Sequence, residues 1–192
     1  MQLELFESGG TKISHVTTYE YLLLLSPSYA IKEKVAQKKH LLNKEVGIST
    51  ENLRSIAHVS LAKFISPFSE RFLFSLIKNV AENFKPFKLE IKELEEFDHG
   101  HSRSLVLKFK DDEYVKRVQE YLSMVLRLNR GTFDPHLTIA RSVPFEDAQR
   151  INNLHDYFFE GSFDCHKITV LKKPLRSKRR YELVAEIGFG RS

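Results

Sequence analysis

A short internal repeat limits the folds open to this 192-residue chain. Residues 58–63 read HVSLAK, and residues 136–141 read HLTIAR. Position by position, both segments carry a histidine, an aliphatic residue, a hydroxyl residue, a second aliphatic residue, an alanine and a cation. Each segment precedes a pattern typical of a helix. The sequence therefore predicts two similar halves, with one such segment in each.

Each copy of the repeat has the alternation expected of a strand with one buried face. In the first copy, His58 and Ser60 share a face, and the aliphatic residues point the other way into a core. In the second copy, His136 and Thr138 occupy the equivalent positions. If the halves pack around a pseudo-twofold axis, the two imidazole and hydroxyl pairs converge on one groove.

This set of side chains suits chemistry on a phosphate ester. Histidine titrates near neutrality, so one imidazole can accept a proton while the other donates one. The hydroxyls of Ser60 and Thr138 can donate hydrogen bonds to the non-bridging phosphate oxygens, where negative charge develops. We therefore expect His58 and His136 to be catalytic and the hydroxyls to bind phosphate, with no metal required.

Hydrophobic periodicity and turn residues give the expected order of elements. Strands and helices alternate, but strands also occur in pairs, which favours an α+β fold with antiparallel sheets over a doubly wound parallel sheet. No linker divides the chain, so we expect a single domain over 1–192. The predicted strands cover 18–26, 56–64, 87–97, 104–109, 135–142, 162–172 and 180–188, and the predicted helices cover 28–44, 69–84, 111–128 and 144–158.

Composition excludes several other classes of protein. With 42% hydrophobic and 29% charged residues, the chain is typical of a globular protein. It has no apolar run long enough to cross a membrane, and the start MQLELFESGG lacks the features of a signal peptide, so we expect a cytoplasmic protein. The single cysteine, Cys165, cannot form an internal disulfide. Because neighbouring strand residues point to opposite faces, His166 is badly placed to activate it. No Cys/His spacing indicates a zinc site, and we expect no cofactor.

The net charge of +5 favours a polyanionic partner. Six basic residues fall within the nine positions of 172–180, KKPLRSKRR. This segment is either a solvated hairpin tip or a contact for a phosphate backbone beside the active site. Likewise, His99 and His101 lie in a polar turn, which we interpret as a solvated loop rather than a metal site.

The two motifs resemble those of the 2H phosphoesterase superfamily, in particular its 2′-5′ RNA ligase-like and cyclic phosphodiesterase branch. The family signature is two copies of His-x-Ser/Thr-x, which HVSL at 58–61 and HLTI at 136–139 both satisfy. The resemblance implies a bilobal α+β fold with two pseudo-symmetric halves and the active site in the groove between them. Residues 1–17 have no evident match in the family and are expected to form an N-terminal extension. It implies hydrolysis of 2′,3′-cyclic phosphates or related esters, and for some members 2′-5′ ligation of RNA ends. By carry-over, the two histidines are the acid–base pair and the hydroxyls bind phosphate.

Further residues are candidate substrate contacts. Lys63 and Arg141 point away from the histidine face on a regular strand, and reach a phosphate only if the strand ends or bulges there. Otherwise we expect them to pair with surface carboxylates. Tyr19, Tyr21 and Phe133 are placed either to stack a nucleobase or to pack in the core.

Three functions remain open at this level. The first is hydrolysis of a cyclic nucleotide or of a cyclic-phosphate or 2′-5′-linked RNA end, and the second is 2′-5′ joining of RNA ends. The third is a non-catalytic module that binds nucleotides or RNA on the same scaffold. In each case the expected partner is an RNA terminus or a nucleotide, and no obligate protein partner is evident.

Overall fold

The computed structural model describes residues 18–66, 68–129 and 131–190. The N-terminal extension expected over 1–17 lies outside the described residues. Among the helices described, none is long and apolar enough to cross a membrane.

Two four-stranded antiparallel sheets form the framework, which confirms the predicted α+β class. The first sheet has the order β2-β1-β7-β8, and the second has the order β5-β4-β3-β6. The first sheet is built from β1 (Tyr19–Leu25), β2 (Val59–Ile65), β7 (Lys167–Pro174) and β8 (Glu182–Gly188). The second is built from β3 (Phe87–Asp98), β4 (Ser102–Phe109), β5 (Leu137–Pro144) and β6 (Gly161–Cys165).

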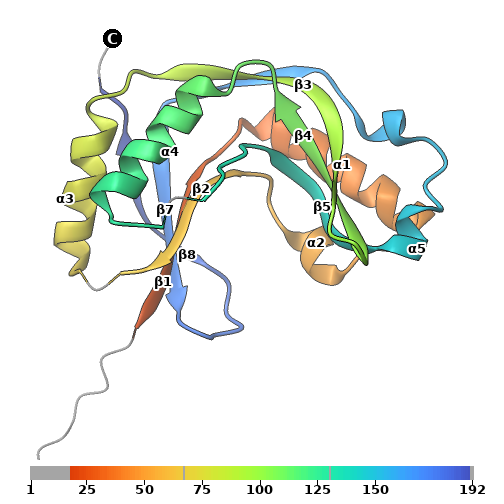
Figure 1. The fold of residues 1–192 in the computed structure, drawn as a ribbon, viewed down its shortest axis with the longest axis horizontal. Helices are drawn as coiled ribbons and strands as arrows, with labels where there is room; N and C mark the ends of the chain where they lie inside the picture. Colours follow the sequence, from red (N-terminus) through yellow and green to blue (C-terminus); the bar gives the residue numbers. More distant parts are fainter. Residues whose placement is uncertain (1–17, 67, 130, 191–192) are drawn as a thin grey trace, which may run out of the picture.

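Helices from each part of the chain pack against the opposite sheet. Both α1 (Tyr29–Glu45) and the short α2 (Thr50–Arg54) connect β1 to β2, yet they contact β5. Conversely, α4 (Glu113–Val125) connects β4 to β5 but contacts β2, and α3 (Glu70–Ala81) packs beside α4 and β8. Figure 1 shows α3 and α4 beside the first sheet, and α1 and α2 beside the second. This exchange ties the two lobes together.

The strands that carry the two motifs are equivalent. Each lies at the edge of its sheet and pairs with an inner strand, β2 with β1 and β5 with β4. The pairing shifts register at the same place in both, so that Leu61 and Ile139 are skipped. A bulge increases twist and redirects the side chains beside it. The pseudo-symmetry predicted from the repeat therefore extends to the local backbone irregularity.

Local sequence explains how α1 and α2 begin and end. The Ser28 hydroxyl accepts a hydrogen bond from the Ile31 amide at the start of α1, and Ser49 caps Asn52 in the same way at the start of α2. Gly47, between the two helices, has φ 74°, a conformation that glycine adopts without a steric penalty. This turn places α2 directly before the first motif.

Two expected elements differ in the structure, and one helix was not expected. The helix predicted over 144–158 is wrong, because α5 covers only Phe145–Ala148 and a 3₁₀ turn covers Leu154–Tyr157. The Asn153 side chain accepts from the His155 amide and begins that separate turn. The strand predicted over 162–172 is two strands, β6 and β7, which belong to different sheets. Finally, α2 was not predicted, since five residues are too few for helical periodicity to show.

The buried apolar residues of both sheets and of the packed helices form one hydrophobic cluster. Leu23 and Leu25 of β1 and Leu105 and Leu107 of β4 are fully buried within it. Burying both inner strands positions the two motif strands beside them.

Candidate functional site

The two motif histidines have matching second partners. His58 and His136 each lie directly before a motif strand. The Nδ1 atom of His58 is 2.8 Å from the carbonyl oxygen of Ile56, and Nδ1 of His136 is 2.7 Å from that of Asp134. A carbonyl oxygen only accepts, so Nδ1 carries the proton in both rings. In the neutral form, each ring therefore has Nε2 free to accept a proton.

The structure brings the two motifs within electrostatic reach of each other. Burial lowers the pKa of His58, and the positive charges of Lys39, Arg141 and His136 lower it further, against the opposing effect of the hydrogen bond to Ile56. His58 is therefore close enough to the second motif for the charges of that motif to affect its pKa. Both rings are half-buried.

His136 has the more strongly perturbed environment. Burial, followed by the charges of Lys108 and Arg141, lowers its pKa to about 4, with Glu95 acting in the opposite direction. Phe97 meets the imidazole edge to face, with ring centroids 5.1 Å apart and an angle of 88° between the planes. The ring is held on one side by the carbonyl of Asp134 and on another by an aromatic neighbour.

The hydroxyl residues keep the predicted side of their strands. Val59 and Leu61 are buried while Ser60 is exposed, and Leu137 and Ile139 are buried while Thr138 is half-buried. A pocket of about 370 Å³ adjoins the second motif. Its lining residues come from β3, β4, β5 and the β3–β4 turn: Phe97, His99, His101, Ser102, Ser104, Val106, His136, Thr138, Arg141 and Ser142. His99 and His101 are exposed, as expected for a loop, but they also line this pocket.

Arg141 and Lys63, although equivalent in the repeat, have different surroundings. Arg141 lines the pocket with His136, at an irregularity of β5 where Ser142 has φ 52°. Lys63 instead pairs with Glu20, with its Nζ 3.2 Å from the carboxylate. Both motif strands skip the residue after the hydroxyl, but only β5 has a second register shift, between Arg103 and Leu105 of β4 and opposite Arg141. The strand irregularity required for a phosphate contact is thus present at Arg141, whereas Lys63 pairs with a carboxylate.

Sequence reasoning missed two residues that connect the motifs. The side chain of Asn52, on α2, hydrogen-bonds both the amide and the carbonyl of Arg141. Lys39, only 1% exposed, donates to the carbonyls of Asn52 at 3.0 Å and of Ser55 at 2.7 Å. Burial lowers the pKa of Lys39 to about 8. Its sequence signal was available, since Lys39 lies on the apolar stripe of α1 four residues after the buried Val35.

The aromatic candidates lie mainly in the core. Tyr21 is 4% exposed, stacks on Phe64 and donates its hydroxyl hydrogen to Glu70. Tyr19 is half-buried beneath the ammonium group of Lys172. Phe133 is half-buried and packs against the hydrophobic cluster. All three residues therefore pack against other parts of the protein, and a stacking role for any of them stays a prediction.

The basic segment forms the expected hairpin tip between β7 and β8. Lys172 and Lys173 form ion pairs with Glu70 and Glu20. In the described part of the chain, the four exposed cations nearer the tip form no ion pair: Arg176, Lys178, Arg179 and Arg180. Strand β2 runs from Val59, next to His58, to Ile65. Because β1 pairs with both β2 and β7, Ile65 lies at the end of the sheet nearest the hairpin tip. The length of β2, at the rise of an extended strand, therefore separates the tip from the first motif by about 20 Å.

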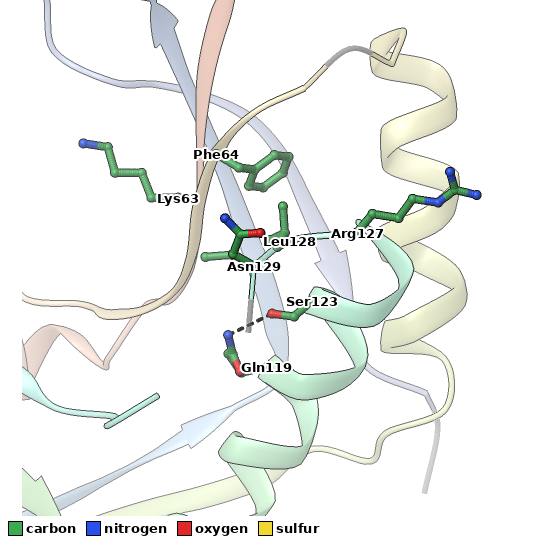
Figure 2. Close-up of a pocket in the computed structure, with 8 residues that line it drawn as sticks. Lys63, Phe64, Gln119, Ser123, Arg127, Leu128 and Asn129 are labelled. Carbon is green, nitrogen blue, oxygen red and sulfur yellow. Dashed lines mark hydrogen bonds between the residues drawn. The ribbon is translucent and has the colours of Figure 1, made fainter. Parts of the chain in front are cut away.

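A second pocket, of about 420 Å³, lies between β2 and the C-terminal end of α4. Figure 2 shows Phe64 directed toward Leu128 and Lys63 extending away from the other labelled side chains. The amide of Gln119 donates to the Ser123 hydroxyl at 2.9 Å. The histidines of the two motifs are not among the residues that line this pocket.

Neither a metal cluster nor an activated thiol accompanies the histidines in the described residues. Across those residues, no group of three or more His, Cys, Asp or Glu side chains is arranged to hold a metal ion. Cys165 is buried, which raises the pKa of its thiol to about 12. A thiol with so high a pKa is unsuited to act as a nucleophile.

Two antiparallel sheets with equivalent edge strands, each directly preceded by a motif histidine, define a two-halved fold of the 2H phosphoesterase type. The family model described as the 2′-5′ RNA ligase superfamily matches residues 36–175, so the protein belongs to that superfamily. The sequence matches no curated protein.

Solved structures support the fold assignment. LigT from E. coli in its apo form superposes with a TM-score of 0.64 at 14% identity, covering 91% of this chain and 99% of LigT. TT0787 from Thermus thermophilus gives 0.62 at 13% identity, covering 88% and 97% of the two chains. A protein described only as a phosphoesterase gives 0.61 at 15% identity, covering 89% of this chain and 98% of its own. At such low identities, the likeness establishes the fold alone.

Proposed function

We propose that the protein is a phosphodiesterase that acts on 2′,3′-cyclic phosphates, or on 2′-5′-linked RNA ends or nucleotides, with His58 and His136 as its acid–base pair. The observation that carries this proposal is the matched hydrogen bonding of the two rings. In each, Nδ1 donates to the carbonyl of the residue two positions earlier. Each Nε2 is then available for proton transfer.

Proton transfer by this pair accounts for both halves of the reaction. The neutral imidazole takes a proton from water as the water oxygen bonds to phosphorus. The protonated imidazole gives its proton to the ribose oxygen as the bond from that oxygen to phosphorus breaks. The product is a phosphomonoester and a free hydroxyl, and the first imidazole has gained the proton that the second has lost.

The groups around the pair suit the charge that develops on phosphate. Ser60 and Thr138 can donate hydrogen bonds to the non-bridging oxygens, and the guanidinium of Arg141 adds a positive charge. The same positive charge lowers the pKa of both imidazoles. A bound phosphate anion opposes that effect and favours the protonated form of one ring.

The superfamily assignment and the solved relatives agree with this chemistry. The superfamily description names 2′-5′ RNA ligases. E. coli LigT has been crystallised with 3′-AMP and with phosphate. For the present protein, these findings support a phosphoesterase with a nucleotide or RNA substrate.

Turnover of 2′,3′-cyclic nucleotides by the purified protein tests the proposal, with and without EDTA. We expect a 2′- or 3′-phosphomonoester product, no effect of EDTA, and a loss of about 10²–10⁴-fold in H58A and in H136A. H40Q, at an exposed position of α1, is the matched control. Activity that depends on added metal, or that survives both substitutions, would refute the two-histidine mechanism.

RNA end-joining is the second candidate, favoured by the unpaired cations at the β7–β8 tip. The tip is about 20 Å from the first motif, a distance that a polymer spans and a mononucleotide does not. Ligation opens the cyclic phosphate as hydrolysis does, but with the 5′-hydroxyl of the second RNA in place of water. One imidazole takes the hydroxyl proton as that oxygen bonds to phosphorus, and the other protonates the ribose oxygen whose bond to phosphorus breaks, so the same histidines would serve. Incubating RNA with a 2′,3′-cyclic phosphate end and RNA with a free 5′-hydroxyl end distinguishes the two, because only ligation yields a longer product.

A further inference from the structure

The pocket beside the second motif extends well beyond the space needed by one phosphate. Val106, Ser104 and Ser102 alternate along β4, and all three line the pocket. Val106 is the register partner of Thr138, at one end of this row. At the rise of a strand, Ser102 lies about 13 Å further along. The pocket therefore has an arm that leads from the second motif to the β3–β4 turn.

One wall of this arm is fixed by buried hydrogen bonds. Ser104 is 4% exposed, and its Oγ accepts a hydrogen bond from the Ser142 amide at 3.1 Å. The same oxygen is 3.0 Å from Nε2 of His99. Ser142 holds φ 52°, a left-handed conformation that is uncommon for serine and requires support from its surroundings. The positions of His99 and Ser142 are thus set before any ligand binds.

Hydrogen-bonding groups in the arm are left without partners. Ser102 is 6% exposed and lines the pocket, yet its hydroxyl makes no hydrogen bond to the described residues. The imidazole of His101 and the guanidinium of Arg141 also line the pocket, and neither forms a side-chain hydrogen bond or an ion pair in the described part of the chain. The Ser102 hydroxyl is not among the buried side-chain atoms without a partner, so its oxygen is open to the pocket and can bind a ligand or water there.

The side chains that line the pocket favour an anionic ligand. Arg141, His99 and His101 supply N–H donors, and no acidic side chain is among the residues that line the pocket. Phe97 is already packed edge-on against His136. Several donors without a carboxylate suit a phosphate, whose oxygens all accept hydrogen bonds.

We propose that this arm binds a second phosphate group of the substrate, one nucleotide away from the phosphate at the two histidines, with Ser102, His101 and Arg141 as its ligands. The inference rests on the proposed function, since it places the reacting phosphate beside His136 and Thr138. The second phosphate is either an internal phosphodiester of RNA or a terminal 5′-phosphate of a mononucleotide. In both cases, the arm selects substrates with two phosphates over those with one.

Binding by isothermal titration tests the proposal with three probes: adenosine 3′-phosphate, adenosine 3′,5′-bisphosphate and the dinucleotide ApA 3′-phosphate. For the wild-type protein, we expect the two-phosphate probes to bind at least tenfold more tightly than adenosine 3′-phosphate. In H101N and in S102A, that ratio should fall to about threefold or less. H40Q should keep the wild-type ratio, and two variants guard against one that fails to fold.

The results distinguish the two sources of the second phosphate, and they test the binding proposal separately from the catalytic one. A gain with the bisphosphate alone identifies a terminal phosphate, while a gain with the dinucleotide identifies an internal phosphodiester. Equal affinity for all three probes, or a gain that persists in both variants, overturns the inference even if cyclic nucleotides are turned over. Conversely, a tenfold ratio without turnover overturns the catalytic proposal alone, and a wild-type protein that binds no probe overturns both.

Discussion

Asn52 holds the backbone of Arg141 through two hydrogen bonds: its Nδ2 donates to the carbonyl at 2.7 Å, and its Oδ1 accepts from the amide at 2.8 Å. The two residues come from opposite halves of the chain. Asn52 precedes the first motif, and Arg141 ends the second. The contact therefore fixes one motif relative to the other. Lys39 supports it, because its Nζ donates a hydrogen bond to the Asn52 carbonyl.

Replacing Asn52 with alanine should lower kcat/KM on a cyclic nucleotide by about tenfold. Two hydrogen bonds worth about 1 kcal/mol each are lost, and the bulge at Arg141 loses its support. N52D, which keeps the acceptor but loses the donor, should fall between wild type and N52A. N83A on the opposite lobe is the matched control, because the Asn83 amide contacts only a local carbonyl. Unchanged kinetics in N52A, measured on a protein with a native circular dichroism spectrum, would show that the Asn52–Arg141 hydrogen bonds do not position the site.

The two histidines should act as one unit. If each single substitution to asparagine lowers kcat by about 10²–10⁴-fold, the double variant of His58 and His136 should be little slower than the slower single variant. A base without its acid partner contributes little, so the losses should not multiply. Single-turnover rates on one cyclic nucleotide provide the measurement. Multiplicative losses would indicate independent roles for the two rings.

The pH dependence should show a maximum on the acidic side of neutrality. The pKa of His136 is lowered to about 4, and that of His58 is lowered from its ordinary value of 6.5. With both pKa values lowered, the pH range in which one ring is neutral and the other protonated should lie on the acidic side of neutrality. The rate should fall at lower pH as the basic ring gains a proton, and at higher pH as the acidic ring loses one.

A substitution checks the sign of this effect. The charge of Arg141 lowers the pKa of both rings, so R141Q should move both limbs of the kcat/KM profile to higher pH. Proton chemical shifts of the two imidazoles provide the same titration without turnover. Limbs that stay in place, or that move to lower pH, would contradict the assignment of the two limbs to these imidazoles.

Neutralising the β7–β8 tip should separate long substrates from short ones. Changing Arg176, Lys178, Arg179 and Arg180 to glutamine removes four exposed charges that form no ion pair within the described residues. The rate on an oligonucleotide should fall at least tenfold and become less sensitive to salt, while mononucleotide turnover stays within twofold.

The matched control for the tip is a second set of four substitutions away from it, Lys44, Lys85, Lys88 and Arg117 to glutamine, which are also exposed and form no ion pair within the described residues. This variant should keep the wild-type rate and salt dependence on the oligonucleotide. Equal losses in the two variants would mean that net charge, rather than the tip, attracts RNA.

The thiol of Cys165 should be inert in the folded protein. It is buried, and its pKa is raised to about 12, so little thiolate exists at neutral pH. Ellman's reagent should label it at least a hundredfold more slowly in buffer than in denaturant. C165A should keep wild-type turnover, whereas rapid labelling of the native protein would contradict the buried position.

Local pattern was sufficient for much of the fold. The strand β1, the helix α1 and both motif strands were predictable because their apolar periodicity and caps lie within a few residues of one another. The prediction of a helix over 144–158 was wrong because the spacing of apolar residues gives no sign of the separate turn that Asn153 caps. The break at His166 was also hidden, since β6 and β7 join different sheets without any interruption in their pattern of side chains.

By itself, the sequence indicated that the histidine and the hydroxyl residue of each motif lie on the same side of the chain, because residues two positions apart in an extended segment share a face. It could not determine that Arg141 lines the pocket while Lys63 pairs with Glu20, or that Asn52 and Lys39 join the halves. Those facts depend on the bulge in β5 and on helices that pack against the opposite sheet, contacts between residues 13 to 89 positions apart. Only tertiary packing sets such distances, since no local rule relates side chains so far apart along the chain.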